Sequence, residues 1–153
     1  MPTKTKGKFS KILVAIDGSQ PSMDAAEYAI EMAKKDAAQL IAVTVNRISL
    51  SSYGLATPEG ELKSPHEKEI ILESKQLFDN LDQKAKLNNV ELKTELINSQ
   101  MSIDGTIVEY AESEDVDLII MGTRGRSGFK KLLLGSIASA VVTYSPCPVM
   151  IIK

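Results

Sequence analysis

The sequence contains one cysteine and no tryptophan, and only 5% of its 153 residues are aromatic. The single cysteine, Cys147, excludes an internal disulfide and fits a reducing compartment, so we expect a cytoplasmic protein. No apolar run reaches the roughly 18 residues that a membrane helix needs, and the polar, basic start lacks the apolar segment of a secretory signal. The formal net charge of −2 also lacks the basic excess typical of a dedicated nucleic-acid binder. We therefore expect neither a membrane nor a nucleic acid as partner.

The composition, with 43% hydrophobic and 25% charged residues, is ordinary for one globular domain. We expect a flexible N-terminal tail over residues 1–9 and a single domain over residues 10–153. Within that domain, residues 46–63 show no hydrophobic period and contain two glycines and a proline. This segment is expected to form a long mobile loop, because loops of such length are often functional.

Five short apolar runs alternate with four segments of helical periodicity. The expected strands are 11–16, 39–45, 90–97, 116–121 and 149–153, and the expected helices are 22–38, 64–85, 102–113 and 136–144. Strands that alternate with helices require crossover connections, which predicts an α/β fold with an open, twisted parallel sheet and helices on both faces. The charged face of 90–97 places that strand near a sheet edge.

The stretch MGTRGRSGFKKLLLGS, residues 121–136, follows an apolar strand and leads into the last helix. Ligands of open α/β sheets bind beyond the carboxyl ends of the strands, and helix N-termini attract anions. Glycines at 122, 125 and 135 allow the backbone to approach a ligand closely, and cations at 124–131 add positive charge. The stretch therefore predicts a phosphate site, although it contains neither G-x-x-x-x-G-K-[ST] nor G-x-G-x-x-G.

Plainer explanations exist for the same residues. The glycines can merely turn the chain between strand and helix, and Asp17 can form a turn or cap a helix. Ser136 can be an ordinary residue of a first helical turn. His66, the only histidine, lies in the first turn of an expected surface helix, where a solvated side chain is the simplest expectation.

The spacing Gly122, two residues, Gly125, nine residues, Gly135 and then Ser136 resembles a known signature, G-x2-G-x9-G-[ST]. It belongs to the ATP-binding branch of the universal stress protein (UspA-like) family. The resemblance extends from Lys11 to Lys153 and includes ILVAIDGS, DLIIMGTRGRSG, LLLGSIASAVV and SPCPVMIIK, with MGT where family members often have MGS. It implies five parallel strands in the order 3-2-1-4-5, the Rossmann-like fold of the adenine nucleotide alpha hydrolases.

The resemblance further implies that ATP, or AMP or another adenine nucleotide such as cyclic AMP, binds at the carboxyl edge of the sheet. Ala15 and Val45 would contact adenine, and Asp17 would accept a hydrogen bond from ribose or adenine. The residues implied to frame the ribose and phosphates are Met121, Gly122, Arg124 and Gly125. Those implied to hold the phosphates, by backbone N–H groups and a hydroxyl, are Gly135, Ser136 and Ile137. Mg²⁺ or Mn²⁺ would bind through the phosphates, with no metal ligand from a protein side chain. A homodimer would form through the C-terminal strand, residues Val149, Met150, Ile151 and Ile152.

On this basis we expect a nucleotide-dependent stress-response protein with at most weak ATPase activity and no catalytic residues. The sequence contains no Walker-type lysine and no catalytic-loop aspartate set. Two alternatives stay open: a nucleotide hydrolase or adenylyl-transfer enzyme on the same fold, and a nucleotide-free dimeric interaction module. Gly122→Val or Gly135→Val is expected to abolish ATP binding in an intact fold, because each Cβ would occupy the space of a phosphate.

Overall fold

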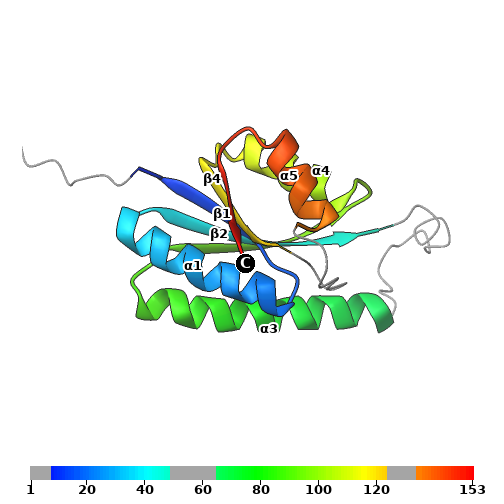
Figure 1. The fold of residues 1–153 in the computed structure, drawn as a ribbon. Coiled ribbons are helices and arrows are strands. Elements are labelled where there is room, and N and C mark those ends of the chain that lie inside the picture. Colours follow the sequence, from blue (N-terminus) through cyan, green and yellow to red (C-terminus); the bar gives the residue numbers. More distant parts are fainter. Residues whose placement is uncertain (1–7, 49–64, 124–133) are drawn as a thin grey trace, which may run out of the picture.

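The structure is a computed structural model that describes residues 8–48, 65–123 and 134–153. Five strands and four helices alternate along this part of the chain (Figure 1). In chain order they are β1 (Lys11–Ala15), α1 (Gln20–Asp36), β2 (Gln39–Arg47), α3 (Pro65–Leu87), β3 (Leu92–Ser99), α4 (Ile103–Ser113), β4 (Leu118–Gly122), α5 (Ser136–Tyr144) and β5 (Val149–Ile152).

The strands form one parallel sheet in the order β3-β2-β1-β4-β5, which confirms the predicted fold. The central strands β1 and β4 are buried on both faces, which explains why their sequences are continuously apolar rather than alternating. The strand with charged residues, β3, lies at one edge as expected, and β5 lies at the other. The carboxyl ends of all five strands therefore meet along one side of the sheet.

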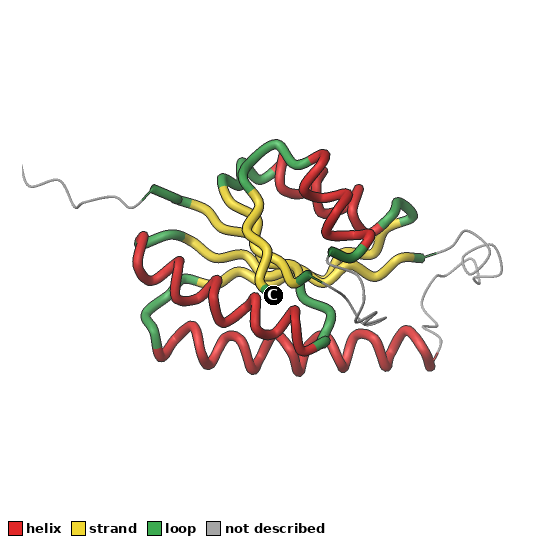
Figure 2. Tube along the Cα trace, in the orientation of Figure 1, coloured by secondary structure: helices red, strands yellow, loops and turns green. Residues whose placement is uncertain are grey.

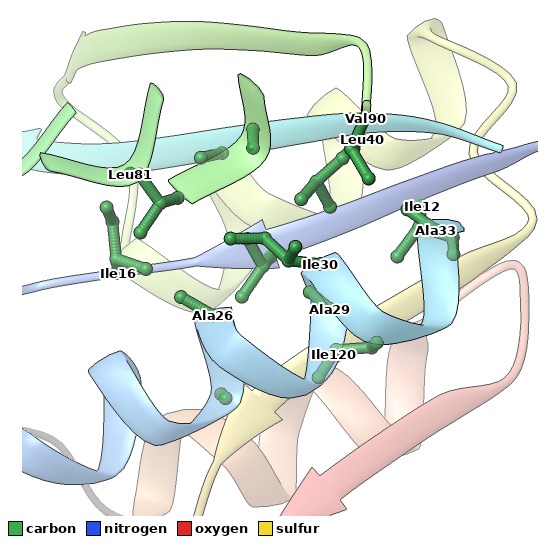
Figure 3. Close-up of a cluster of buried hydrophobic side chains, with 14 of the residues drawn as sticks. Ile12, Ile16, Ala26, Ala29, Ile30, Ala33, Leu40, Leu81, Val90 and Ile120 are labelled. Carbon is green, nitrogen blue, oxygen red and sulfur yellow. The ribbon is translucent and has the colours of Figure 1, made fainter. Parts of the chain in front are cut away.

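Helices cover both faces of the sheet, with α1 and α3 on one side and α4 and α5 on the other (Figures 1 and 2). Small side chains let α1 approach the strands closely, since Ala25, Ala26 and Ala29 are fully buried. Figure 3 shows this layer, in which the labelled residues of α1 lie beside Ile12, Leu40 and Ile120. The opposite layer packs Ile107, Ala111, Ala138 and Val141 against Leu13, Ile41 and Ile119.

Several element boundaries differ from the sequence-based expectations. Strand β2 continues to Arg47, so the loop expected from residue 46 begins later, because Asn46 and Arg47 pair with Asn98 and Ser99 of β3. The remainder of that loop, 49–64, lies outside the described residues. The expected tail also ends too late: the Phe9 N–H donates to Asp36 Oδ2 at 3.0 Å, and the Phe9 ring packs against the core.

Tyr110 on α4 carries a buried hydroxyl. Its Oη makes no hydrogen bond within the described part of the chain. Burial, followed by the nearby Glu95 carboxylate, raises the pKa of this phenol well above its usual value. The carboxylate is close enough to act on the phenol through its charge without forming a bond of normal geometry.

Candidate functional site

A cavity of about 900 Å³ lies at the carboxyl ends of β1, β2 and β4. The N-terminal halves of α3 and α4 and the first turn of α5 complete its walls. Strand β1 lies between β2 and β4. From β1 the chain adds β2 and β3 on one side, and it then returns past β1 to add β4 and β5 on the other side. The cavity therefore lies at the topological switch point, where open α/β sheets bind ligands, and its volume suits a small organic molecule.

Most of the residues predicted from the sequence to bind a nucleotide lie around this cavity. Eight of them line it: Ala15, Asp17, Val45, Met121, Gly122, Gly135, Ser136 and Ile137. The other two, Arg124 and Gly125, lie outside the described residues, as do all the cations at 124–131. The structure thus brings together residues from three strands and one helix, and their role in binding stays a prediction.

Asp17 organises the turn that joins β1 to α1. Its Oδ1 accepts hydrogen bonds from the backbone N–H of Ser19, at 2.9 Å, and from the Ser19 hydroxyl. Gly18 between them has φ 85°, a conformation that favours glycine. Ser19 in turn caps α1. The turn-forming explanation of Asp17 is therefore correct, and a ligand contact would be a second role for the same carboxylate.

Gly122 has a structural role that the sequence did not reveal. A Cβ at this position would lie 2.8 Å from the backbone C and O atoms of Pro21, in the first turn of α1. No side chain larger than hydrogen fits there without moving β4 away from α1. The expectation that Gly122→Val leaves the fold intact is therefore wrong, because the space that its side chain would enter is occupied by protein.

The start of α5 supplies backbone N–H groups at the opposite wall. Gly135 is the N-cap, with no side-chain cap, and its own N–H donates to the Thr123 carbonyl at 2.6 Å. The first bond to the helix start runs from the Ser139 N–H to the Gly135 carbonyl at 2.9 Å. The N–H groups of residues 136–138 precede it and have no acceptor within the helix. The Gly135 N–H is therefore already bonded, whereas the N–H groups of residues 136–138 are the ones that the helix leaves without an acceptor.

The wall formed by α3 was not expected from the sequence. Six of its residues line the cavity: His66, Glu69, Ile70, Glu73, Ser74 and Leu77. Their helical spacing could be read from the sequence, but nothing in that spacing shows that this half of α3 borders the ends of the strands. His66 is exposed, as expected, yet it also lines the cavity. Thr44, Asn46 and Thr123 are further polar lining residues without a sequence signal.

Within residues 8–48, 65–123 and 134–153, no group of three or more histidine, cysteine, aspartate or glutamate side chains could hold a metal ion. No helix in the same residues is both long enough and apolar enough to span a membrane. The cavity combines an apolar floor with a helix N-terminus on one side and carboxylates on the other.

Comparison with solved structures supports the fold. The structure of the hypothetical protein MJ0577 is similar with a TM-score of 0.78 at 26% identity, and the alignment covers 95% of this chain and 96% of that one. A universal stress protein in complex with cAMP has a TM-score of 0.65 at 21% identity, covering 95% of this chain and 97% of that one. The universal stress protein from Archaeoglobus fulgidus in complex with dAMP has a TM-score of 0.68 at 20% identity, covering 95% and 98%.

Sequence comparison identifies the family. Residues 8–153 match the model of the Universal stress protein family. Universal stress protein MJ0531 of Methanocaldococcus jannaschii is 35% identical over 147 residues, which cover 95% of this chain and 82% of that protein. Universal stress protein YxiE of Bacillus subtilis is 33% identical over 149 residues, covering 95% and 99%. This chain therefore belongs to the universal stress protein family.

Proposed function

We propose that this protein binds ATP, or a closely related adenine nucleotide, in the cavity at the carboxyl edge of the sheet. The observation that carries the proposal is the start of α5, where N–H groups without helical acceptors border the cavity. Such a helix end attracts phosphate through its N–H groups and its dipole. The relatives solved with cAMP and dAMP bind ligands of the same class.

The cavity offers a different surface to each part of a nucleotide. Ser136 and Ile137 lie at the helix end, and Ala15 and Val45 provide apolar surface at the ends of β1 and β2. The phosphates would bind at α5, together with Mg²⁺ or Mn²⁺, and Asp17 would bind the ribose or base. Arg124 and Gly125 belong to the same proposal through the G-x2-G-x9-G-[ST] signature.

Binding rather than efficient hydrolysis is the proposed activity. Glu69 and Glu73 line the cavity, and the presence of these carboxylates is the observation that favours a hydrolase as the second candidate. Both belong to α3, however, and α3 and α5 pack on opposite faces of the sheet. We therefore propose a nucleotide-dependent signalling protein of the stress response, acting in the cytoplasm, with at most weak ATPase activity.

Purified protein is expected to release an adenine nucleotide when denatured, and added ATP is expected to raise its Tm. Saturation at a hundred times the Kd stabilises a protein by about 2.7 kcal/mol, which is about 5–10 °C for a chain of this length. Chromatography of the released nucleotide and thermal melts with ATP and Mg²⁺ measure both. Absence of any nucleotide together with an unchanged Tm would favour the nucleotide-free interaction module, and rapid turnover of ATP would favour the hydrolase.

We also propose a homodimer through β5. The Pro148 and Ile152 carbonyls accept bonds from Ile119 and Thr123 at 3.0 and 3.1 Å, so the intervening backbone groups of Val149 and Ile151 face away from β4. An edge strand with apolar side chains and outward-facing backbone groups is prone to pair with another strand. Ile151→Pro removes one outward N–H and is expected to yield folded monomers in sedimentation velocity. Ile151→Val keeps that N–H and should stay dimeric; a monomeric wild type, or a dimeric proline variant, would contradict the proposed interface.

A further inference from the structure

Ser74 is a buried polar residue in an apolar stripe. It lies on the inner face of α3, four residues after Ile70 and three before Leu77, and it is only 4% exposed. Its hydroxyl makes no hydrogen bond to any residue that the structure describes. The Ser74 oxygen is not sealed off by protein, because Tyr110 Oη is the only fully enclosed side-chain oxygen or nitrogen without a partner among the described residues. Since Ser74 also lines the cavity, a ligand in the cavity can supply the missing partner.

Other hydroxyls near this side of the cavity are already engaged. Thr44 Oγ1 donates to the Ile16 carbonyl at 3.0 Å, and Ser22 Oγ donates to the Ser19 carbonyl at 2.9 Å. Both of those hydroxyls hold the turn and strand ends in place. Ser74 has no such bond among the described residues, so its hydroxyl is available to a ligand.

The position of Ser74 relative to α5 indicates which end of a nucleotide it meets. Helix α3 covers one face of the sheet and α5 covers the other (Figure 1). The cavity is lined by residues of both helices. A nucleotide whose phosphates bind at the start of α5, and whose base extends over the strand ends past Ala15 and Val45, therefore brings the far edge of that base toward α3. Glu69 lines the same side, and its negative charge disfavours phosphate there.

We propose that Ser74 hydrogen-bonds the edge of the nucleobase, a contact that rests on the proposed nucleotide function. A hydroxyl both donates and accepts, so it can meet a ring nitrogen or an exocyclic amino group. Ile16 and Leu77, which line the cavity in the α1 and α3 layer, add apolar surface beside that edge of the ring. Ser74 is thus a base-binding residue outside the glycine signature.

Calorimetric titration of Ser74→Ala with ATP, AMP and adenosine tests this contact. Affinity is expected to fall by about the same factor for all three ligands, up to about tenfold, because the lost bond involves only their common base. Inorganic tripolyphosphate should bind the variant and the wild type equally. The Tm of ligand-free Ser74→Ala should equal or exceed that of the wild type, since alanine has a higher helix propensity than serine.

Tyr110→Phe provides the matched control, because it removes a buried hydroxyl without a described partner that does not line the cavity. Its nucleotide affinities should equal those of the wild type. Unchanged affinity of Ser74→Ala for adenosine, or a lower Tm of the ligand-free variant, would overturn the proposal. If the wild type itself binds none of the three ligands, the proposed function fails first and the base contact with it.

Discussion

Gly122→Val is expected to destabilise the fold by about 3 kcal/mol or more and to lower the Tm by about 6–12 °C. The new Cβ would lie 2.8 Å from backbone atoms of Pro21, and backbone in the first turn of a packed helix cannot rotate aside. Either β4 or α1 must then shift, which disturbs the core that Ile120 and Ala29 share. Urea unfolding followed by circular dichroism measures the loss.

Gly105→Ala is the matched control for this prediction. Its Cβ would meet Ser102 Oγ at 2.9 Å and Met101 Cε at 3.4 Å, both on side chains that can rotate. Loss of the Ser102 cap and gain of helix propensity are each worth about 1 kcal/mol and oppose one another, so stability should change by less than about 1 kcal/mol. A Gly122→Val variant as stable as Gly105→Ala would show that β4 and α1 adjust freely.

Ser136→Asp is expected to weaken ATP binding at least about a hundredfold while leaving the protein as stable as the wild type or slightly more stable. A carboxylate about 4 Å from a phosphate costs about 4 kcal/mol near a protein surface. The same charge favours the helix by about 0.3–1 kcal/mol, because α5 has no acidic residue in its first turn. Calorimetric titration and thermal melts separate the two effects.

Ser136→Asn keeps nearly the same shape as aspartate without the charge, so its ATP affinity should stay within about tenfold of the wild type. The loss in Ser136→Asp should also grow with ligand charge, from adenosine through AMP to ATP. This differs from Ser74→Ala, in which the three ligands should lose affinity equally. Wild-type ATP affinity in Ser136→Asp would exclude the start of α5 as the phosphate site.

The enzyme alternative depends on residues that the cavity brings together. Glu69 and Glu73 were not candidates in the sequence, because acidic residues on a long amphipathic helix usually form its solvated face. Only the position of α3 beside the strand ends gives them access to the cavity. Any hydrolysis measured in the purified protein would make these two carboxylates the first residues to substitute.

Local patterns in the sequence determined the fold and much of the candidate site. Apolar β-branched runs separated by helical periods specify alternating strands and helices, and crossover connections then force a parallel sheet. The carboxyl ends of such strands must share one edge, so the order of elements alone groups the residues that end β1, β2 and β4. Eight of the predicted binding residues line one cavity for this reason.

Tertiary structure alone decided what several of those residues do. Gly122 meets Pro21, the Gly135 N–H bonds the Thr123 carbonyl, and Ser74 faces a cavity instead of the core. Each of these contacts forms because the fold brings together two segments that are not neighbours along one helix or strand. Periodicity and spacing describe only neighbours along one element, so they carry no information about which backbone or cavity lies opposite a given side chain.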